Sequence, residues 1–158
     1  MQTLISRFAT ATFALIFVSA VAAGVAAAGD VHKAINTGDD GVAILGYDPV
    51  AYFTESRPIK GKPEFVYEWE DAIWHFANAK HRDLFAGSPE KYAPQYGGHC
   101  SMALSQGGIK VVNPEAWMIV DGKLYLSFSK KGREKFNQDI SGNIKKANEN
   151  WAKVRKKN

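Results

Sequence analysis

The feature that most constrains the fold is a hairpin signature late in the chain. Residues 116–120 (Ala-Trp-Met-Ile-Val) and 123–128 (Lys-Leu-Tyr-Leu-Ser-Phe) flank the dipeptide Asp121-Gly122. Apolar and aromatic side chains of this kind favour strands, and Asp-Gly is a preferred two-residue turn between antiparallel strands. The sequence therefore predicts a β-hairpin over about 116–128.

An earlier segment carries the same period of two. Phe65, Tyr67 and Trp69 occupy every second position, and the alternation resumes after Asp71 in residues 73–76 (Ile-Trp-His-Phe). This spacing places one set of side chains on each face of a strand, so we expect a second hairpin over about 64–77.

Helices are expected around the two hairpins. Asn78 and Ser129 are residue types that cap helix N-termini, and residues 87–89 (Gly-Ser-Pro) end the first of these helices before a short turn at 90–92. The second helix extends to about Gln138. From 141 to 156, apolar residues recur at helical spacing, which predicts an amphipathic C-terminal helix. Hairpins that build a small antiparallel sheet with flanking helices indicate an α+β fold.

The N-terminal segment has the pattern of a secretory signal peptide. Arg7 precedes an apolar run over 8–20, and small residues follow up to Ala28. This order predicts cleavage near Ala28/Gly29 and a periplasmic or secreted protein. No later segment is apolar over the roughly 20 residues that a membrane span needs, so we expect no transmembrane segment in the mature chain.

The mature chain divides into two predicted parts. Residues 29–41 are polar and glycine-rich, which suits a flexible lead-in, and residues 42–156 form the predicted single domain. Loss of residues 1–28 removes only Arg7 among the charged residues, so the mature chain is mildly basic. Much of that charge follows residue 144, where it forms either a solvated helix face or a contact to an anionic lipid or polymer. Export fits poorly with nucleic-acid binding.

A single cysteine, Cys100, must be accounted for in a compartment that favours disulfides. No intrachain disulfide is available, so stability must come from the core. Large aromatic side chains are dense enough to build one. They are Tyr47, Tyr52, Phe53, Phe65, Tyr67, Trp69, Trp74, Phe76 and Phe85.

Three groups of residues together resemble the YHS domain. They are 46–53 (Gly-Tyr-Asp-Pro-Val-Ala-Tyr-Phe), 74–77 (Trp-His-Phe-Ala), and Phe85 with 88–92 (Ser-Pro-Glu-Lys-Tyr). The remainder, including the glycine-rich loop 94–100 and the C-terminal helical extension, is similar to the exported single-domain bacterial branch of that family. The resemblance implies a small module that binds metal. In the form attached to transport ATPases, cysteines stand where this chain has Ala51, Ala77 and His81, so that ligand set is not intact here.

Residues near the glycine-rich loop provide some of the donors that a soft metal ion needs. His99, Cys100 and Met102 follow two glycines and combine imidazole, thiolate and thioether, which suits copper better than zinc. Neighbouring side chains diverge, so a further donor is needed, and His81 and His75 are the candidates.

Each of these donors also has a purely structural interpretation. Cys100 and Met102 suit a core, His75 suits cross-strand packing, and His81 suits a helix surface. Asp48-Pro49 is best explained as a turn whose carboxylate accepts hydrogen bonds from nearby backbone amides.

The sequence favours an exported non-enzymatic module that binds a transition metal. No catalytic residue is assigned. One alternative is a metal-free module that binds a small ligand or an exported protein partner. Another is a thiol-dependent redox protein that uses Cys100, although adjacency to His99 does not by itself build a catalytic pair.

Overall fold

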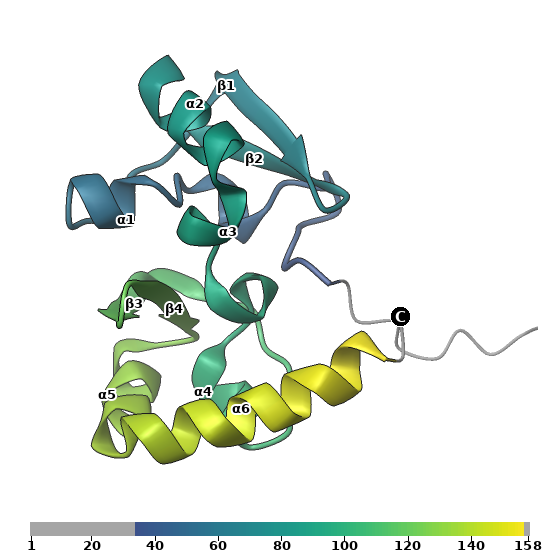
Figure 1. Cartoon of the computed structure of the whole chain (residues 1–158), viewed down its shortest axis with the longest axis vertical. Helices are drawn as coiled ribbons and strands as arrows, with labels where there is room; N and C mark the ends of the chain where they lie inside the picture. The colour runs from purple at the N-terminus through teal and green to yellow at the C-terminus, as the bar shows by residue number, and fades with distance from the viewer. Residues whose placement is uncertain (1–33, 157–158) are drawn as a thin grey trace, which may run out of the picture.

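The computed structural model describes residues 34–156, and the fold is α+β as the sequence predicts. We call residues 34–92 the first half and residues 95–156 the second half (Figure 1). The first half contains η1 (Ile44–Gly46), α1 (Ala51–Thr54), β1 (Lys62–Trp69), β2 (Ala72–Phe76), α2 (Ala79–Gly87) and α3 (Pro89–Tyr92). The second half contains η2 (Gln95–Gly98), α4 (Ser101–Ser105), β3 (Asn113–Val120), β4 (Lys123–Ser127), α5 (Lys130–Gln138) and α6 (Ile140–Arg155).

Both predicted hairpins are present, but each forms its own sheet. β1 pairs antiparallel with β2, and β3 with β4, in two separate two-stranded sheets. The expectation of one sheet built from both hairpins is corrected, because the second half of the chain packs below the first rather than beside it (Figure 1). Asp121 and Gly122 both have positive φ, which is the twist that a two-residue hairpin turn requires.

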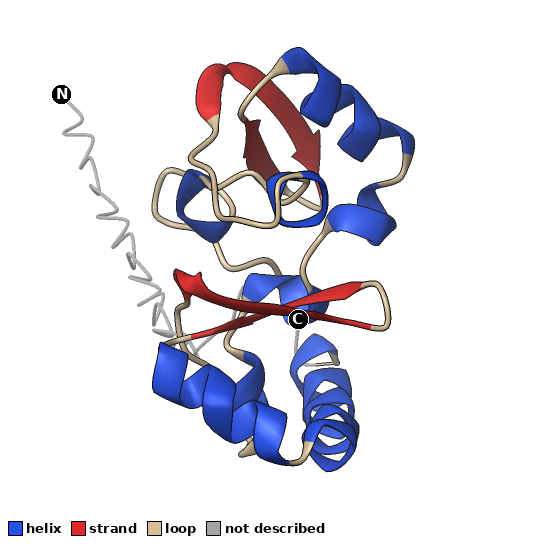
Figure 2. Cartoon of the chain, turned by 90° about the vertical axis from the view of Figure 1, so that its left-hand side faces the viewer, coloured by secondary structure: helices blue, strands red, loops and turns tan. Residues whose placement is uncertain are grey.

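The second hairpin separates two cores. Leu124 and Leu126 pack in the main core with Trp74 and Phe85 of the first half. Tyr125, which points to the opposite face because side chains alternate along a strand, packs in a second core with Phe136. Figures 1 and 2 show this hairpin between the first half above it and helices α5 and α6 below it. Four consecutive positions of β4, residues 124–127, are therefore buried.

The helix starts predicted from capping residues are confirmed. The Asn78 side chain accepts a hydrogen bond from the backbone N–H of His81 at the start of α2, and Ser129 accepts one from Gly132 at the start of α5. The C-terminal helix α6 is capped in the same way by Asp139. These side chains satisfy N–H groups that have no partner within their own helix.

The packed domain extends further toward the N-terminus than Val42, where the sequence placed its beginning. Ile35 is 4% exposed in the main core. Asn36 donates from its backbone to Gly97 O and from its side chain to Gly98 O. The described part of the lead-in is therefore fixed against the glycine-rich loop. The predicted signal peptide, residues 1–28, lies outside the described residues.

Within residues 34–156, no helix has both the length and the apolar character needed to cross a membrane.

Gly97 should be far more sensitive to substitution than Gly122, although both have positive φ. A Cβ on Gly97 would lie 1.9 Å from the carbonyl oxygen of Ala34, whereas nothing lies within 4 Å of a Cβ on Gly122. We expect Gly122→Ala to cost about 1–2 kcal/mol for the backbone conformation alone, and Gly97→Ala about 1–3 kcal/mol more. Urea unfolding of the two variants measures the difference. Equal losses would show that the segment around Ala34 does not pack against the loop.

Candidate functional site

His81 is a buried partner of Asp48 rather than a residue of the helix surface. Its side chain is 6% exposed and that of Asp48 is 0% exposed. His81 Nδ1 lies 2.6 Å from Asp48 Oδ2, so the ring donates there to the carboxylate. His81 Nε2 lies 3.2 Å from Thr54 Oγ1. Both ring nitrogens are therefore engaged within the fold.

Asp48 joins three separate segments. Its Oδ1 accepts from the backbone N–H groups of Val50 and Ala51, at 2.8 and 3.3 Å, where the short helix α1 begins. Its Oδ2 accepts from the N–H of Ala77, just after β2, at 2.9 Å, as well as from His81 in α2. The predicted turn at Asp48-Pro49 is confirmed, and the carboxylate also reaches residues far along the chain.

Cys100 is buried and its sulfur is hydrogen-bonded. The residue is 2% exposed and belongs to the main core. Its Sγ accepts from the backbone N–H of Phe128, after β4, at 3.2 Å and from that of Ala103 in α4 at 3.5 Å. The sulfur thus links the loop to the end of the second hairpin.

The other predicted donors lie in different surroundings. His99 is buried, and its ring packs against Trp151 of α6 with centroids 5.8 Å apart. Met102 packs against both cores. His75 is half-buried on β2 opposite Val66 and lines a hollow with Lys60. Among residues 34–156, no three His, Cys, Asp or Glu side chains come together as a metal-binding group. In this arrangement the donors do not fit a metal site, and copper binding stays a prediction.

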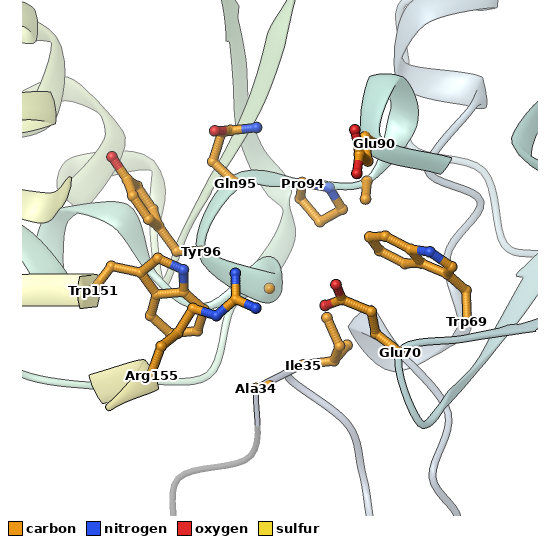
Figure 3. A pocket seen from close by; sticks show the side chains of 12 residues that line it. Ala34, Ile35, Trp69, Glu70, Glu90, Pro94, Gln95, Tyr96, Trp151 and Arg155 are labelled. Carbon is orange, nitrogen blue, oxygen red and sulfur yellow. The ribbon is translucent and has the colours of Figure 1, made fainter. Parts of the chain in front are cut away.

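A groove between the two halves of the fold is lined by residues from both of them. Its volume is about 210 Å³. It is lined by Ala34, Ile35, Trp69, Glu70, Glu90, Ala93, Pro94, Gln95, Tyr96, Gly97, Trp151 and Arg155. Figure 3 shows the two tryptophans on opposite sides, with Glu70 and Arg155 pointing toward each other between them.

Each indole wall is held by aromatic neighbours. Trp69, at the end of β1, packs on Trp74 and Phe85 with centroid distances of 6.0 and 5.8 Å. Trp151 of α6 packs on Tyr96 and His99, at 6.2 and 5.8 Å. The walls are therefore positioned before any ligand arrives. His99 contributes to this wall through its ring contact.

Two residues that line the groove have strained backbone conformations. Glu70 and Tyr96 line the groove and have φ of 48° and 59°, a left-handed conformation that costs a residue with a Cβ about 1–2 kcal/mol. The turn Glu70-Asp71 has the twist that usually selects Asn-Gly, yet neither position is glycine. Strain of this kind is often retained at binding sites, where it aims a side chain.

Tyr96 remains a neutral hydrogen-bond donor. Burial raises the pKa of its hydroxyl well above the ordinary value, and nearby Tyr125 raises it further. The hydroxyl lies 3.0 Å from Asn148 Oδ1 of α6. This contact fixes α6 against η2 and keeps Trp151 and Arg155 at the groove.

Sequence reasoning did not identify the groove. The sequence predicts an alternating strand around Trp69 and an amphipathic helix over 141–156, which includes Trp151, and both elements are present. The sequence does not show that these two side chains are only partly buried, and that is what identifies them as groove residues. Glu70, directly after Trp69, and Arg155, one helical turn after Trp151, are the signal that could have drawn attention to these tryptophans.

Comparisons of this chain with models of protein families, with curated proteins and with solved structures found no match. The resemblance to the YHS domain therefore stays a prediction.

Removal of His81 should destabilise the fold strongly. In His81→Ala the Asp48 carboxylate stays buried without its closest partner, and loss of one member of a buried pair costs about 3–5 kcal/mol. His75→Ala is the matched control, because His75 is only half-buried, and we expect it to cost less than about 1 kcal/mol. Urea unfolding at neutral pH measures both. A small loss in His81→Ala, comparable to the control, would contradict a structural role for the pair.

Proposed function

We propose that this chain is an exported, non-enzymatic module that binds a small organic ligand in the groove between its two halves. The observation that carries the proposal is the pair of tryptophans, one from each half, on opposite sides of a cavity of about 210 Å³. Export rests on the sequence of residues 1–28 alone.

The groove brings apolar and charged side chains together. Trp69, Trp151, Ile35 and Pro94 line it with apolar groups, and Glu70, Glu90 and Arg155 add charge, so that its surface is more polar than apolar. Small-molecule sites combine apolar walls with a small number of polar groups that orient the ligand. A volume of about 210 Å³ restricts the ligand to a small molecule.

The buried thiol is separate from this groove. Cys100 is 2% exposed and does not line the cavity. A redox role for the thiol would need access that the folded chain does not offer, so the geometry supports binding better than thiol chemistry.

Binding in the groove can be tested through the indole N–H signals of the four tryptophans by NMR. A panel of small cationic, anionic, zwitterionic and neutral molecules is titrated into the purified protein. We expect at least one compound to shift the signals of Trp69 and Trp151 and not that of Trp117, which lies outside the groove lining.

A matched pair of variants checks the location. Gln95→Trp places a bulky ring at the groove and should abolish binding, while Gln138→Trp, on the exposed side of α5, should leave binding unchanged. If no compound in the panel moves the Trp69 and Trp151 signals, the proposal fails.

Copper binding through Cys100 and His99 is the second candidate. N–H donors to a sulfur are a feature that proteins use to tune ligating thiolates, and Cys100 Sγ accepts two of them. Met102 lies in the same short segment. Because these donors do not form a site by themselves in the described residues, this candidate requires a donor from a second chain or a rearranged loop.

Titration with Cu(I) against a competing chelator tests the second candidate. This candidate predicts one tightly bound ion per Cys100, loss of binding in Cys100→Ala, and weaker binding in Met102→Leu. Met118→Leu changes a thioether outside the loop and should bind as the parent does. Tight binding that survives Cys100→Ala would exclude the assigned site.

A further inference from the structure

The groove carries charges of both signs at its mouth. Glu70 and Glu90 bring two carboxylates, and Arg155 brings one guanidinium. Figure 3 shows the Glu70 carboxylate and the Arg155 guanidinium directed into the space between the indoles. From this arrangement we propose that the ligand is a small zwitterion, with its cationic group between the indoles and carboxylates and its anionic group on Arg155. The inference rests on the proposed function.

The cationic end is assigned by the aromatic and acidic residues together. A cation within about 6 Å of a tryptophan face is attracted by the ring, and tryptophan is the strongest side chain in this respect. The walls are two indoles, and Tyr96 stands behind one of them. Carboxylates beside such walls add direct charge attraction, so an ammonium group is favoured over a neutral group of the same shape.

The anionic end is assigned by Arg155. The guanidinium presents a planar fork of donors that matches a carboxylate in two parallel hydrogen bonds. Arg155 lies one helical turn after Trp151 on α6, so the charge and the indole wall belong to one rigid element. A plain cation would leave this guanidinium to repel it, and a plain anion would face two carboxylates.

Without a ligand, the charged side chains of the groove attract one another only weakly. Glu70, Glu90 and Arg155 are all exposed, and ion pairs between exposed side chains are weak because water competes with them. A ligand that fills the cavity excludes this water. The two charged groups of the ligand then interact with the carboxylates and with the guanidinium. These contacts replace the weak attraction between the carboxylates and the guanidinium across the groove.

The strained turn supports the assignment to Glu70. The left-handed backbone at Glu70 directs its side chain to the groove at the end of β1, next to Trp69. Asn-Gly at this turn would relieve the strain, but it would remove the carboxylate. The turn thus places charge and aromatic wall side by side.

The test compares zwitterions with matched molecules that lack one charge. Glycine betaine, L-proline and L-phenylalanine are the zwitterionic probes. Choline keeps the trimethylammonium group of betaine without the carboxylate, and 3,3-dimethylbutanoate keeps its shape and carboxylate without the positive charge. We expect at least one zwitterion to bind with a dissociation constant of about 0.1–1 mM, as suits so small a ligand, and choline and dimethylbutanoate each to bind at least about tenfold more weakly than betaine.

Charge variants separate the two ends. Glu70→Gln should weaken zwitterion binding about three- to tenfold, while Glu64→Gln, exposed on the same strand, should not. Arg155→Gln should weaken binding to a similar extent and also reduce the preference for betaine over choline. Lys146→Gln, exposed on α6, is its control.

The outcomes also distinguish this inference from the proposed function. Binding of choline or dimethylbutanoate at the Trp69 and Trp151 signals, with no zwitterion binding, overturns the zwitterion while leaving the groove a binding site. Zwitterion binding that ignores both Glu70→Gln and Arg155→Gln overturns the charge assignment. A panel in which nothing binds at the groove overturns both.

Discussion

The buried carboxylate of Asp48 is the interaction on which the first half of the fold depends. A carboxylate with no exposure is tolerated only if its oxygens are fully hydrogen-bonded, and here four donors surround it. Those donors begin α1, end β2 and belong to α2. Because one side chain holds all three, the β1–β2 hairpin has a fixed position, and the Trp69 wall at its end has one too.

The second hairpin and the helix starts could be predicted because the residues that determine them lie close together in the sequence. The Asp121-Gly122 turn and the caps at Asn78 and Ser129 involve residues within a few positions of each other, so the sequence contains the whole interaction. Asp48 and His81 are 33 positions apart, and nothing in helical spacing announces that this histidine turns inward. Two separate sheets instead of one likewise depend on how the halves pack, which strand periodicity does not encode.

The glycine-rich loop shows the same limit in another form. Two glycines before His99 and Cys100 are typical of a backbone that another group approaches closely, and a close approach does occur. The approaching group is the chain itself, because Ala34 and Asn36 lie against Gly97 and Gly98. A glycine-rich loop allows another group to approach its backbone closely. Its sequence does not show whether that group is a ligand or the N-terminal segment of the same chain.

This packing also explains why a groove exists. The N-terminal segment packs against Gly97 and Gly98 on one side of the space between the halves. On another side, the Tyr96 hydroxyl donates to Asn148 of α6. The β1–β2 turn forms a third side. Trp69, Glu70, Trp151 and Arg155 from these elements line the space that is left between them. Trp69 and Trp151 are only partly buried, and a ligand that covered them would bury apolar surface from both halves.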